Sequence, residues 1–289
     1  MSITDCPSVS KSGILIKELI GKQNPFLITR LGCAIGFITL LFDKKQPLNT
    51  DFIYRMERDD GIYCNNASDI KLFAEMYLEA IKNSDYLAVF PSLWPYFSEM
   101  QNYFLNKYSI QSLHNRSIEP FYNILENEIP WTHSLIGKKV LIINPFIDSM
   151  KKQLSNKFQM FKDKKLFLDG QEFIFYKTFV SLANNRPHKN WYETYEIMRD
   201  DIQKLDFDIA LLGCGGYGLP LSNFIYKKMN KSAIYIGGGL QLLFGIMGNR
   251  WENNPMWKKI MNESQSQFIR PSGDEIIKNK NMIENACYW

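Results

Sequence analysis

The sequence predicts a doubly wound α/β fold, in which a mostly parallel sheet carries helices on both faces. Short apolar runs recur along the chain, and each is followed by a Gly or Pro break and then by a helical pattern. The runs are apolar on both sides of the strand, which indicates strands buried on both faces. Alternation of such strands with helices is typical of βαβ crossovers.

The elements can be placed in order along the chain. The expected strands cover residues 26–32, 86–92, 139–146, 173–182, 207–216 and 232–239. Helical spacing of apolar residues predicts helices over 68–84, with Ser68 as its cap, 148–161 and 190–205. The segment 113–131 is irregular and aromatic, and short helices and coil are expected beyond Trp251. The order of elements predicts a Rossmann-like sheet.

Composition places the chain among ordinary globular proteins. It has 289 residues, of which 45% are hydrophobic and 22% charged. The net charge of +4 is much smaller than the strong positive charge typical of nucleic-acid-binding domains, so no nucleic acid is expected as a partner. The five cysteines are scattered without a C-x-x-C, and the N-terminus lacks an apolar signal core. The longest apolar region, 25–42, contains Arg30 and two glycines, so no membrane span and a cytoplasmic location are expected.

One glycine cluster raises the question of a ligand. Residues 208–225 read DIALLGCGGYGLPLSNFI, and Gly213, Gly215 and Gly218 have the G-x-G-x-x-G spacing of dinucleotide phosphate loops. A Rossmann NAD site also needs an acidic residue about 20 positions further on, but no Asp or Glu stands between Asp208 and Glu252. An NAD or S-adenosylmethionine enzyme is therefore disfavoured. Another phosphate-bearing ligand and a tight turn without a ligand both remain open.

Several strand ends are suited to an anion, and ligands of such sheets bind beyond these ends. The ends carry Arg30 and Gly32, Pro91 and Ser92, Asn144 and Pro145, Gly213–Gly218, and Gly237–Gly239. Arg30 follows an apolar strand directly, so its charge needs either a ligand anion or a carboxylate partner. Arg250 stands beside Trp251 and is either a phosphate clamp or a solvated loop residue. Together these ends favour a nucleotide diphosphate.

Three carboxylates are candidate catalytic residues: Asp60, Glu119 and Asp148. A transferase needs a base for the acceptor hydroxyl, and Asp60 and Glu119 are preferred for it. Asp148 stands at a helix start, where N-capping is the favoured role. The three histidines share no ligand spacing, so no metal site is assigned to them. The G-x-S-x-G elbow and the Walker signature are both absent from the sequence.

Five stretches together resemble a known family. They are ITRLG, EPFY, PWTHSLIGKKVLIINPF, GCGGYGLPL and GGGLQLLFGIMGNRW, and the likeness spans roughly residues 25–252. The chain is similar to glycosyltransferase-like proteins of bacterial polysaccharide clusters and large algal viruses, which are related to the GT-D fold glycosyltransferases. The resemblance implies a Rossmann-like domain that binds a nucleotide sugar and transfers the sugar to a hydroxyl of a glycan or glycoprotein acceptor. The expected donor is a UDP-sugar, and a pentose donor such as UDP-xylose is one candidate.

The irregular segment 113–131 joins two halves of one compact unit, and the boundary between them is expected near Pro130. Residues 1–130 form an N-terminal α/β half on the acceptor side, and residues 131–289 form a nucleotide-binding half with a helical tail. Trp94, Tyr63, Tyr217 and Trp251 either stack on the sugar or base or pack in the core. The expected nucleotide-sugar-binding residues are Arg30, Gly32, Asn144, Ser149, Gly213, Gly215, Gly216, Tyr217, Gly218, Gly238, Gln241 and Arg250.

The chain departs from the family pattern at one point. The GT-D pattern follows its Arg-x-Gly with Asp-Gly-Glu, acids linked to a divalent metal, whereas this chain has Cys33, Ala34 and Ile35 there. A Mn²⁺ or Mg²⁺ ion would then have to be held elsewhere, for example by Asp59 or Asp60, and metal-independent transfer is favoured. Without these acids, a non-catalytic nucleotide- or glycan-binding protein remains an alternative.

Overall fold

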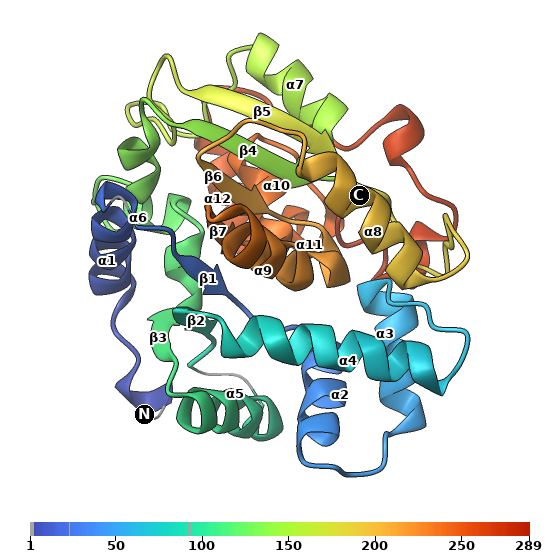
Figure 1. Cartoon of the computed structure of the whole chain (residues 1–289). Helices are drawn as coiled ribbons and strands as arrows, with labels where there is room; N and C mark the ends of the chain where they lie inside the picture. The colour runs from blue at the N-terminus through green and yellow to red at the C-terminus, as the bar shows by residue number, and fades with distance from the viewer. Residues whose placement is uncertain (1–2, 23, 92–93) are drawn as a thin grey trace.

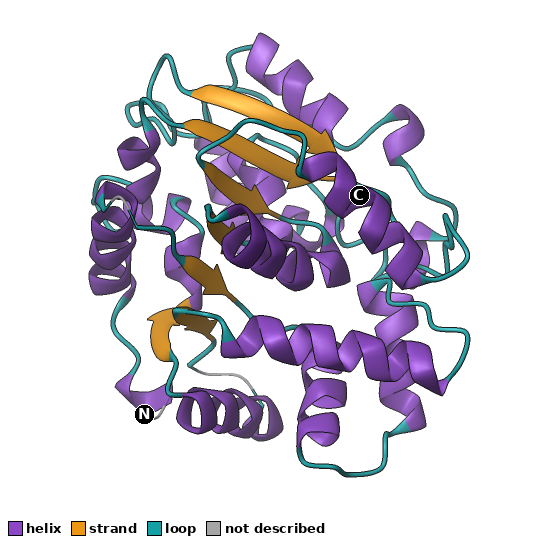
Figure 2. Ribbon diagram, viewed as in Figure 1, coloured by secondary structure: helices purple, strands orange, loops and turns teal. Residues whose placement is uncertain are grey.

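The computed structural model describes residues 3–22, 24–91 and 94–289, and within them one seven-stranded sheet forms the centre of the molecule (Figures 1 and 2). All strand pairs are parallel, in the order β3-β2-β1-β7-β6-β4-β5. The strands are β1 Leu27–Thr29, β2 Tyr86–Val89, β3 Gln111–His114, β4 Lys139–Asn144, β5 Glu172–Lys177, β6 Ile209–Leu212 and β7 Ser232–Tyr235. The predicted doubly wound α/β class is confirmed.

The early and late strands belong to the same sheet. Leu27 and Ile28 of β1 pair with Ala233 and Ile234 of β7, so the chain returns to its first strand with its last. The residues of β6 are fully buried, as expected for apolar runs in the middle of a parallel sheet. The sequence missed β3, because QSLH is not an apolar run. It is an edge strand, which needs fewer apolar residues than a central one.

Helices cover both faces of the sheet. The helices α2 (Cys33–Asp43), α4 (Ala67–Lys82), α5 (Pro95–Tyr108), α8 (Trp191–Ile202) and α9 (Gly218–Met229) bury their apolar residues in one core layer. The opposite layer is built by α1 (Val9–Gly21), α6 (Phe121–Leu125), α7 (Ile147–Ser155), α10 (Leu240–Leu243) and α12 (Pro255–Glu263). Two further helices, α3 (Thr50–Asp60) and α11 (Asn249–Glu252), lie near the carboxyl ends of the strands.

Two helix starts differ from the prediction. Helix α4 is capped by Asn66, whose side chain accepts a hydrogen bond from the Asp69 N–H at 3.0 Å, and not by Ser68. Asn and Ser cap about equally well, so neighbouring candidates cannot be separated by type alone. Helix α7 ends at Ser155 rather than at 161, and Asp148 does not cap it with its side chain. The predicted strands also end earlier, with β2 at Val89; Ser92 lies outside the described residues.

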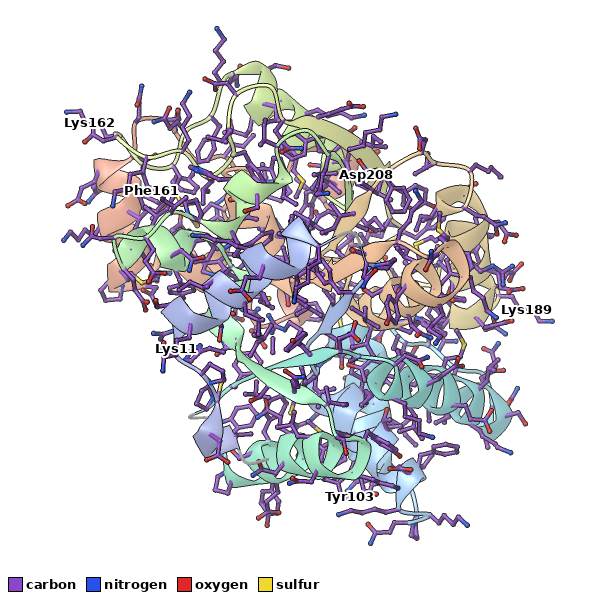
Figure 3. All side chains as sticks on the ribbon, turned by 60° about the vertical axis from the view of Figure 1, so that its left-hand side comes forward. Lys11, Tyr103, Phe161, Lys162, Lys189 and Asp208 are labelled. Carbon is purple, nitrogen blue, oxygen red and sulfur yellow. The ribbon has the colours of Figure 1, made fainter. Side chains whose placement is uncertain are left out.

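The chain beyond Trp251 folds back onto the sheet. After α12 it runs as coil and 3₁₀ turns to Trp289, which is buried and donates its indole N–H to the Glu275 carbonyl at 2.8 Å. This path returns the C-terminus to the carboxyl ends of the strands (Figure 1). The labelled lysines Lys11, Lys162 and Lys189 reach outward from separate parts of the surface (Figure 3). None of the described helices combines the length and apolarity that crossing a bilayer requires.

Candidate functional site

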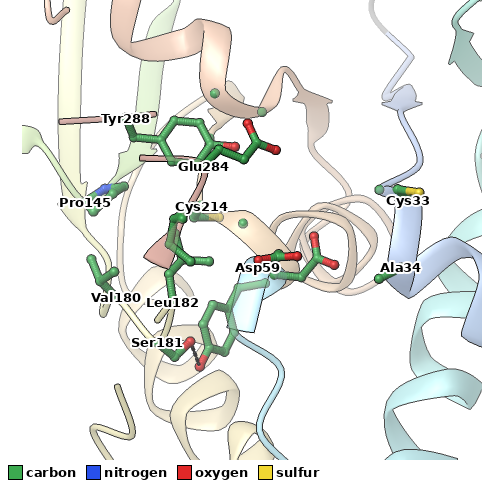
Figure 4. A pocket seen from close by; sticks show the side chains of 18 of the residues that line it. Cys33, Ala34, Asp59, Pro145, Val180, Ser181, Leu182, Cys214, Glu284 and Tyr288 are labelled. Atoms are coloured by element: carbon green, nitrogen blue, oxygen red, sulfur yellow. Dashed lines mark hydrogen bonds between the residues drawn. The ribbon is translucent and has the colours of Figure 1, made fainter. Parts of the chain in front are cut away.

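A cavity of about 480 Å³ lies beyond the carboxyl ends of the parallel strands (Figure 4). The loops after β1, β2, β4, β5, β6 and β7 line it, together with α3 and the C-terminal residues. Helices that follow β1 and β6 enter one layer, whereas those after β4 and β7 enter the other. Loops that part in this way open a crevice, where ligands of doubly wound sheets bind. The volume is in the range of small-ligand sites.

The turn after β7, Gly237–Gly239, lies beside Arg30 and beside Tyr288, which bonds Arg250. Gly237 has a φ of +78°, and a Cβ there would lie 3.2 Å from the Nη1 atom of Arg30. Arg30 donates from Nη1 to the Ile236 carbonyl at 3.0 Å and lies over the Phe90 ring. On the other side, a Cβ on Gly238 would lie 2.6 Å from the ring of Tyr288, whose hydroxyl accepts from Arg250 at 3.2 Å. Both arginines line the cavity.

The two arginines differ in their partners. Arg250 donates from Nη2 to Glu284 at 2.7 Å. Arg30 has no carboxylate within 4.0 Å among the residues that the structure describes. The sequence left open whether a ligand or a carboxylate neutralises Arg30, and the direct carboxylate partner is not found in the described part of the chain. A partly buried cation without such a partner favours an anionic ligand.

The turn after β6, Gly213–Gly218, has its glycines packed against protein. A Cβ on Gly216 would lie 2.1 Å from Ile62, and one on Gly218 would lie 2.2 Å from the Tyr235 ring. A Cβ on Gly213 would lie 2.6 Å from the carbonyl oxygen of Gly237. Gly215 has a φ of +57° and lines the cavity with Gly213 and Tyr217. Close backbone packing accounts for most of the G-x-G-x-x-G spacing.

Asp60 is the predicted carboxylate that faces the cavity. Asp60 is the last residue of α3. A Cβ on Gly32 would lie 3.4 Å from its Oδ1, so the Asp60 carboxyl group is next to the N-terminus of α2. Burial and then the charge of Asp59 raise the pKa of Asp60 to about 7, while the Ile35 backbone N–H works in the other direction. Asp59 itself is held by Arg58 through two hydrogen bonds of 2.6 and 2.8 Å.

Glu119 lies behind the Gly237–Gly239 turn and does not line the cavity. Its Oε1 would be 2.0 Å from a Cβ on Gly239, so the carboxyl group packs directly on the turn. Burial raises the pKa of Glu119 to about 7, although the charges of Arg30 and Arg250 oppose the shift. Glu119 is therefore close to both arginines but is separated from the cavity by the turn.

Asp148 and Ser149 lie outside the cavity lining. The Glu275 carboxylate accepts the backbone N–H groups of Asp148 at 2.9 Å and Ser149 at 3.1 Å, and also the Ser149 hydroxyl. The Asp148 carboxylate binds Lys177 at 2.5 Å. The start of α7 thus already holds a carboxylate of the same chain, because an anion is favourable at a helix N-terminus. The fold therefore does not place Asp148 or Ser149 in the cavity with the other candidate site residues.

Asn144, Gln241 and Tyr217 line the cavity but have partners within the protein. The Asn144 amide donates to the Gly213 carbonyl at 2.8 Å and accepts the Phe146 N–H at 2.9 Å. Gln241 donates to the Tyr288 carbonyl at 3.0 Å. These side chains tie neighbouring loops together, and so they shape the cavity floor.

The aromatic candidates separate into two groups. Trp94 is 63% exposed and lines the cavity. Tyr217 also lines it, but its ring stacks on Trp191 with centroids 5.4 Å apart. Tyr63 is fully buried, with its hydroxyl 2.5 Å from Thr194, and Trp251 packs beside Tyr288; neither lines the cavity.

Sequence reasoning missed two walls of the cavity. One is the loop after β5, Thr178–Leu182, where Ser181 donates to the Tyr217 hydroxyl at 2.9 Å (Figure 4). The other is formed by Ile283, Glu284, Tyr288 and Trp289. The predicted strand end at 182 placed the first loop within the sheet, and nothing in the local sequence indicates that the C-terminal residues return to the site.

The residues present do not fit a divalent metal ion. At the positions where the GT-D pattern has acids, Cys33 and Ala34 line the cavity without offering a carboxylate. Asp59, which was considered as a replacement ligand, is engaged by Arg58. Within the described ranges no group of three or more His, Cys, Asp or Glu side chains is arranged to bind a metal.

Comparison with known proteins agrees with this fold. A model of the GT-D fold-like domain matches residues 15–243. The chain belongs to the GT-D-like family. The match includes every strand of the sheet and both glycine turns, but it ends before Arg250, Glu284 and Tyr288. Neither the curated proteins nor the solved structures contain a match to the chain. The GT-D-like domain thus accounts for the sheet and most of the cavity, and the C-terminal wall lies outside it.

Proposed function

We propose that the protein is a glycosyltransferase that moves a sugar from a nucleoside-diphosphate donor to a hydroxyl of a glycan or glycoprotein. The observation that carries this proposal is that Arg30 packs on the Gly237–Gly239 turn and Arg250 bonds Tyr288, whose ring packs on the same turn, in a cavity that Asp60 also lines. Sugar transfer requires cations for the leaving diphosphate and a base for the acceptor hydroxyl. This GT-D-like domain offers two arginines for the first role and Asp60, with a pKa of about 7, for the second.

In the proposed reaction, Asp60 takes the proton of the acceptor hydroxyl as the oxygen attacks the anomeric carbon of the donor. The bond between that carbon and the diphosphate oxygen breaks, and its electron pair leaves with the nucleoside diphosphate. Arg30 and Arg250 bind the leaving phosphates, which carry the developing charge. A carboxylate whose pKa is about 7 is matched to this role, because it is partly ionised at neutral pH and still basic enough to accept a proton.

Arg30 and Arg250 replace the metal in this proposal, since the chain has Cys33, Ala34 and Ile35 where the GT-D pattern has acids. UDP is the donor nucleotide that we propose, and the pentose donor UDP-xylose remains a prediction from the family resemblance. The sheet half up to residue 130 is proposed as the acceptor side, because Trp94 and Asp60 both reach the cavity from it. An exposed Trp offers a flat apolar face to a sugar ring.

Ligand binding and transfer test the proposal. Thermal unfolding is followed with UDP, GDP, CMP, NAD or S-adenosylmethionine, each with and without Mn²⁺, and we expect stabilisation by UDP without a metal requirement. Transfer from UDP-sugars is then compared for the wild type and Asp60→Asn, with an expected loss of about 10²- to 10⁴-fold in turnover. Stabilisation by NAD or S-adenosylmethionine but not by UDP would contradict the proposal, and full turnover by Asp60→Asn would exclude Asp60 as the base.

A further inference from the structure

The C-terminal segment Ile283–Trp289 forms one wall of the cavity although it lies outside the GT-D-like match. Figure 4 shows Glu284 and Tyr288 on this wall, with Cys33 and Ala34 on the opposite side. Ile283 and Trp289, at the two ends of the segment, are both buried. The segment is therefore anchored at both ends, and Glu284 and Tyr288 between them line the cavity.

The backbone of this segment is sterically unusual. Glu284, Asn285 and Ala286 have φ values of 43°, 54° and 61°, so three successive residues with a Cβ adopt the left-handed region. The Cys287 N–H donates to the Ile283 carbonyl at 3.0 Å, and the Asn249 amide donates to the Asn285 carbonyl at 2.6 Å. Such a backbone persists only where its surroundings hold it, and it is concentrated at functional sites.

The turn directs the Glu284 carboxylate to a guanidinium that also faces the cavity. Oε2 of Glu284 accepts from Arg250 at 2.7 Å, and the Glu284 side chain is 68% exposed. A carboxylate and a phosphate bind a guanidinium by the same charge-assisted hydrogen bonds. An exposed ion pair of this kind contributes little free energy, so a stronger anion can displace it.

We propose that Glu284 is an internal competitor for Arg250 in the diphosphate site, which makes it a residue that sets the affinity of the donor pocket. The proposal rests on the function proposed above. A ligand that needs Arg250 must first displace Glu284. Its apparent affinity is therefore its intrinsic affinity multiplied by the fraction of molecules in which Arg250 is free. A diphosphate carries more charge and reaches Arg30 as well, whereas a single carboxylate gains less from the exchange. Glu284 thereby lowers the affinity of every ligand that uses Arg250 by the same factor.

Calorimetric titration with UDP and with inorganic pyrophosphate tests this competition. Glu284→Gln keeps the size of the side chain and removes its charge, and we expect it to bind UDP about two- to fivefold more tightly than the wild type, the range that one exposed ion pair supplies. The matched control is Glu252→Gln, because Glu252 pairs with Arg270 in the same part of the chain but does not line the cavity. The control should bind UDP like the wild type.

A double-mutant cycle separates competition at Arg250 from a general effect of charge. In an Arg250→Ala background, Glu284→Gln should leave the UDP affinity unchanged, because the competed group is gone. A gain in affinity that persists in this background would overturn the proposal, since it would reflect only the loss of a negative charge near the ligand.

The outcomes also distinguish this inference from the proposed function. If the wild type binds UDP and Glu284→Gln binds it equally or more weakly, the competitor role is overturned and the proposed function stands. If neither protein binds UDP but pyrophosphate binds more tightly to Glu284→Gln, the proposed donor fails while the competition at the anion site is supported. Absence of binding by both ligands would contradict both proposals.

Discussion

Two glycine turns follow neighbouring strands of the sheet, yet their surroundings differ. The turn Gly213–Gly218 has the more familiar spacing, but its glycines meet Ile62, Tyr235 and the backbone of the next turn. The turn Gly237–Gly239 has no recognised spacing, but Arg30, Tyr288 and Glu119 pack directly on its three glycines. Glycine spacing therefore reports where the backbone packs closely against its neighbours, whereas the arginines near the second turn are the basis of our proposal for an anion site.

The largest expected effects come from adding one methyl group to each turn. In Gly218→Ala the new Cβ would meet the Tyr235 ring, so we expect a loss of about 1–3 kcal/mol in the free energy of unfolding, with little change in the UDP affinity of the folded protein. In Gly238→Ala the new Cβ displaces the Tyr288 ring, which bonds Arg250, and we expect weaker UDP binding.

Urea unfolding and UDP titration of the two variants measure this difference. The comparison of the turns would be broken if Gly218→Ala lost UDP affinity without losing stability, because the first turn would then contact the ligand itself.

An effect of similar size, but limited to high pH, concerns the carboxyl group behind the second turn. The folded state holds the pKa of Glu119 at about 7, above its usual value, because the group is buried. The folded protein therefore keeps a proton that the unfolded chain releases, so the stability that this group supplies is fully present below about pH 4 and is lost as the pH rises through 7.

Glu119→Gln should remove this dependence and raise the free energy of unfolding at pH 8 by about 1–3 kcal/mol relative to the wild type. Denaturant unfolding at pH 5 and pH 8 measures it, and the two proteins should differ less at pH 5. An equal pH dependence in both proteins would mean that Glu119 does not titrate in this range.

The smallest effect is expected for Asp148 in α7, which follows β4 without a glycine turn. Asp148 forms a partly exposed ion pair with Lys177 outside the cavity. We expect Asp148→Asn to change the free energy of unfolding by less than about 0.5 kcal/mol and to leave turnover unchanged. Turnover is measured beside the Asp60→Asn variant. A tenfold loss of turnover in Asp148→Asn would indicate that Asp148 is a catalytic residue after all.

Much of the fold could be read from local patterns. Runs such as IALL and KVLIIN predicted buried parallel strands, because strands covered on both faces must be apolar throughout. The same reasoning placed Arg30 and the glycine turns at strand ends, and the substitution of Cys33, Ala34 and Ile35 for acids was visible in the sequence alone. The edge strand β3 and the cap of α4 were missed, because their residues carry no distinctive local signal.

The composition of the site was decided by tertiary structure. Arg30 and Arg250 stand 220 positions apart and line the same cavity only because β7 returns beside β1 and the C-terminal segment folds over the same edge. Asp148 was excluded and Asp60 brought to the cavity by the paths of α7 and α3. Local patterns encode burial and backbone conformation, which depend on near neighbours. Which charges face one another depends on contacts between distant segments, and these exist only once the chain has folded.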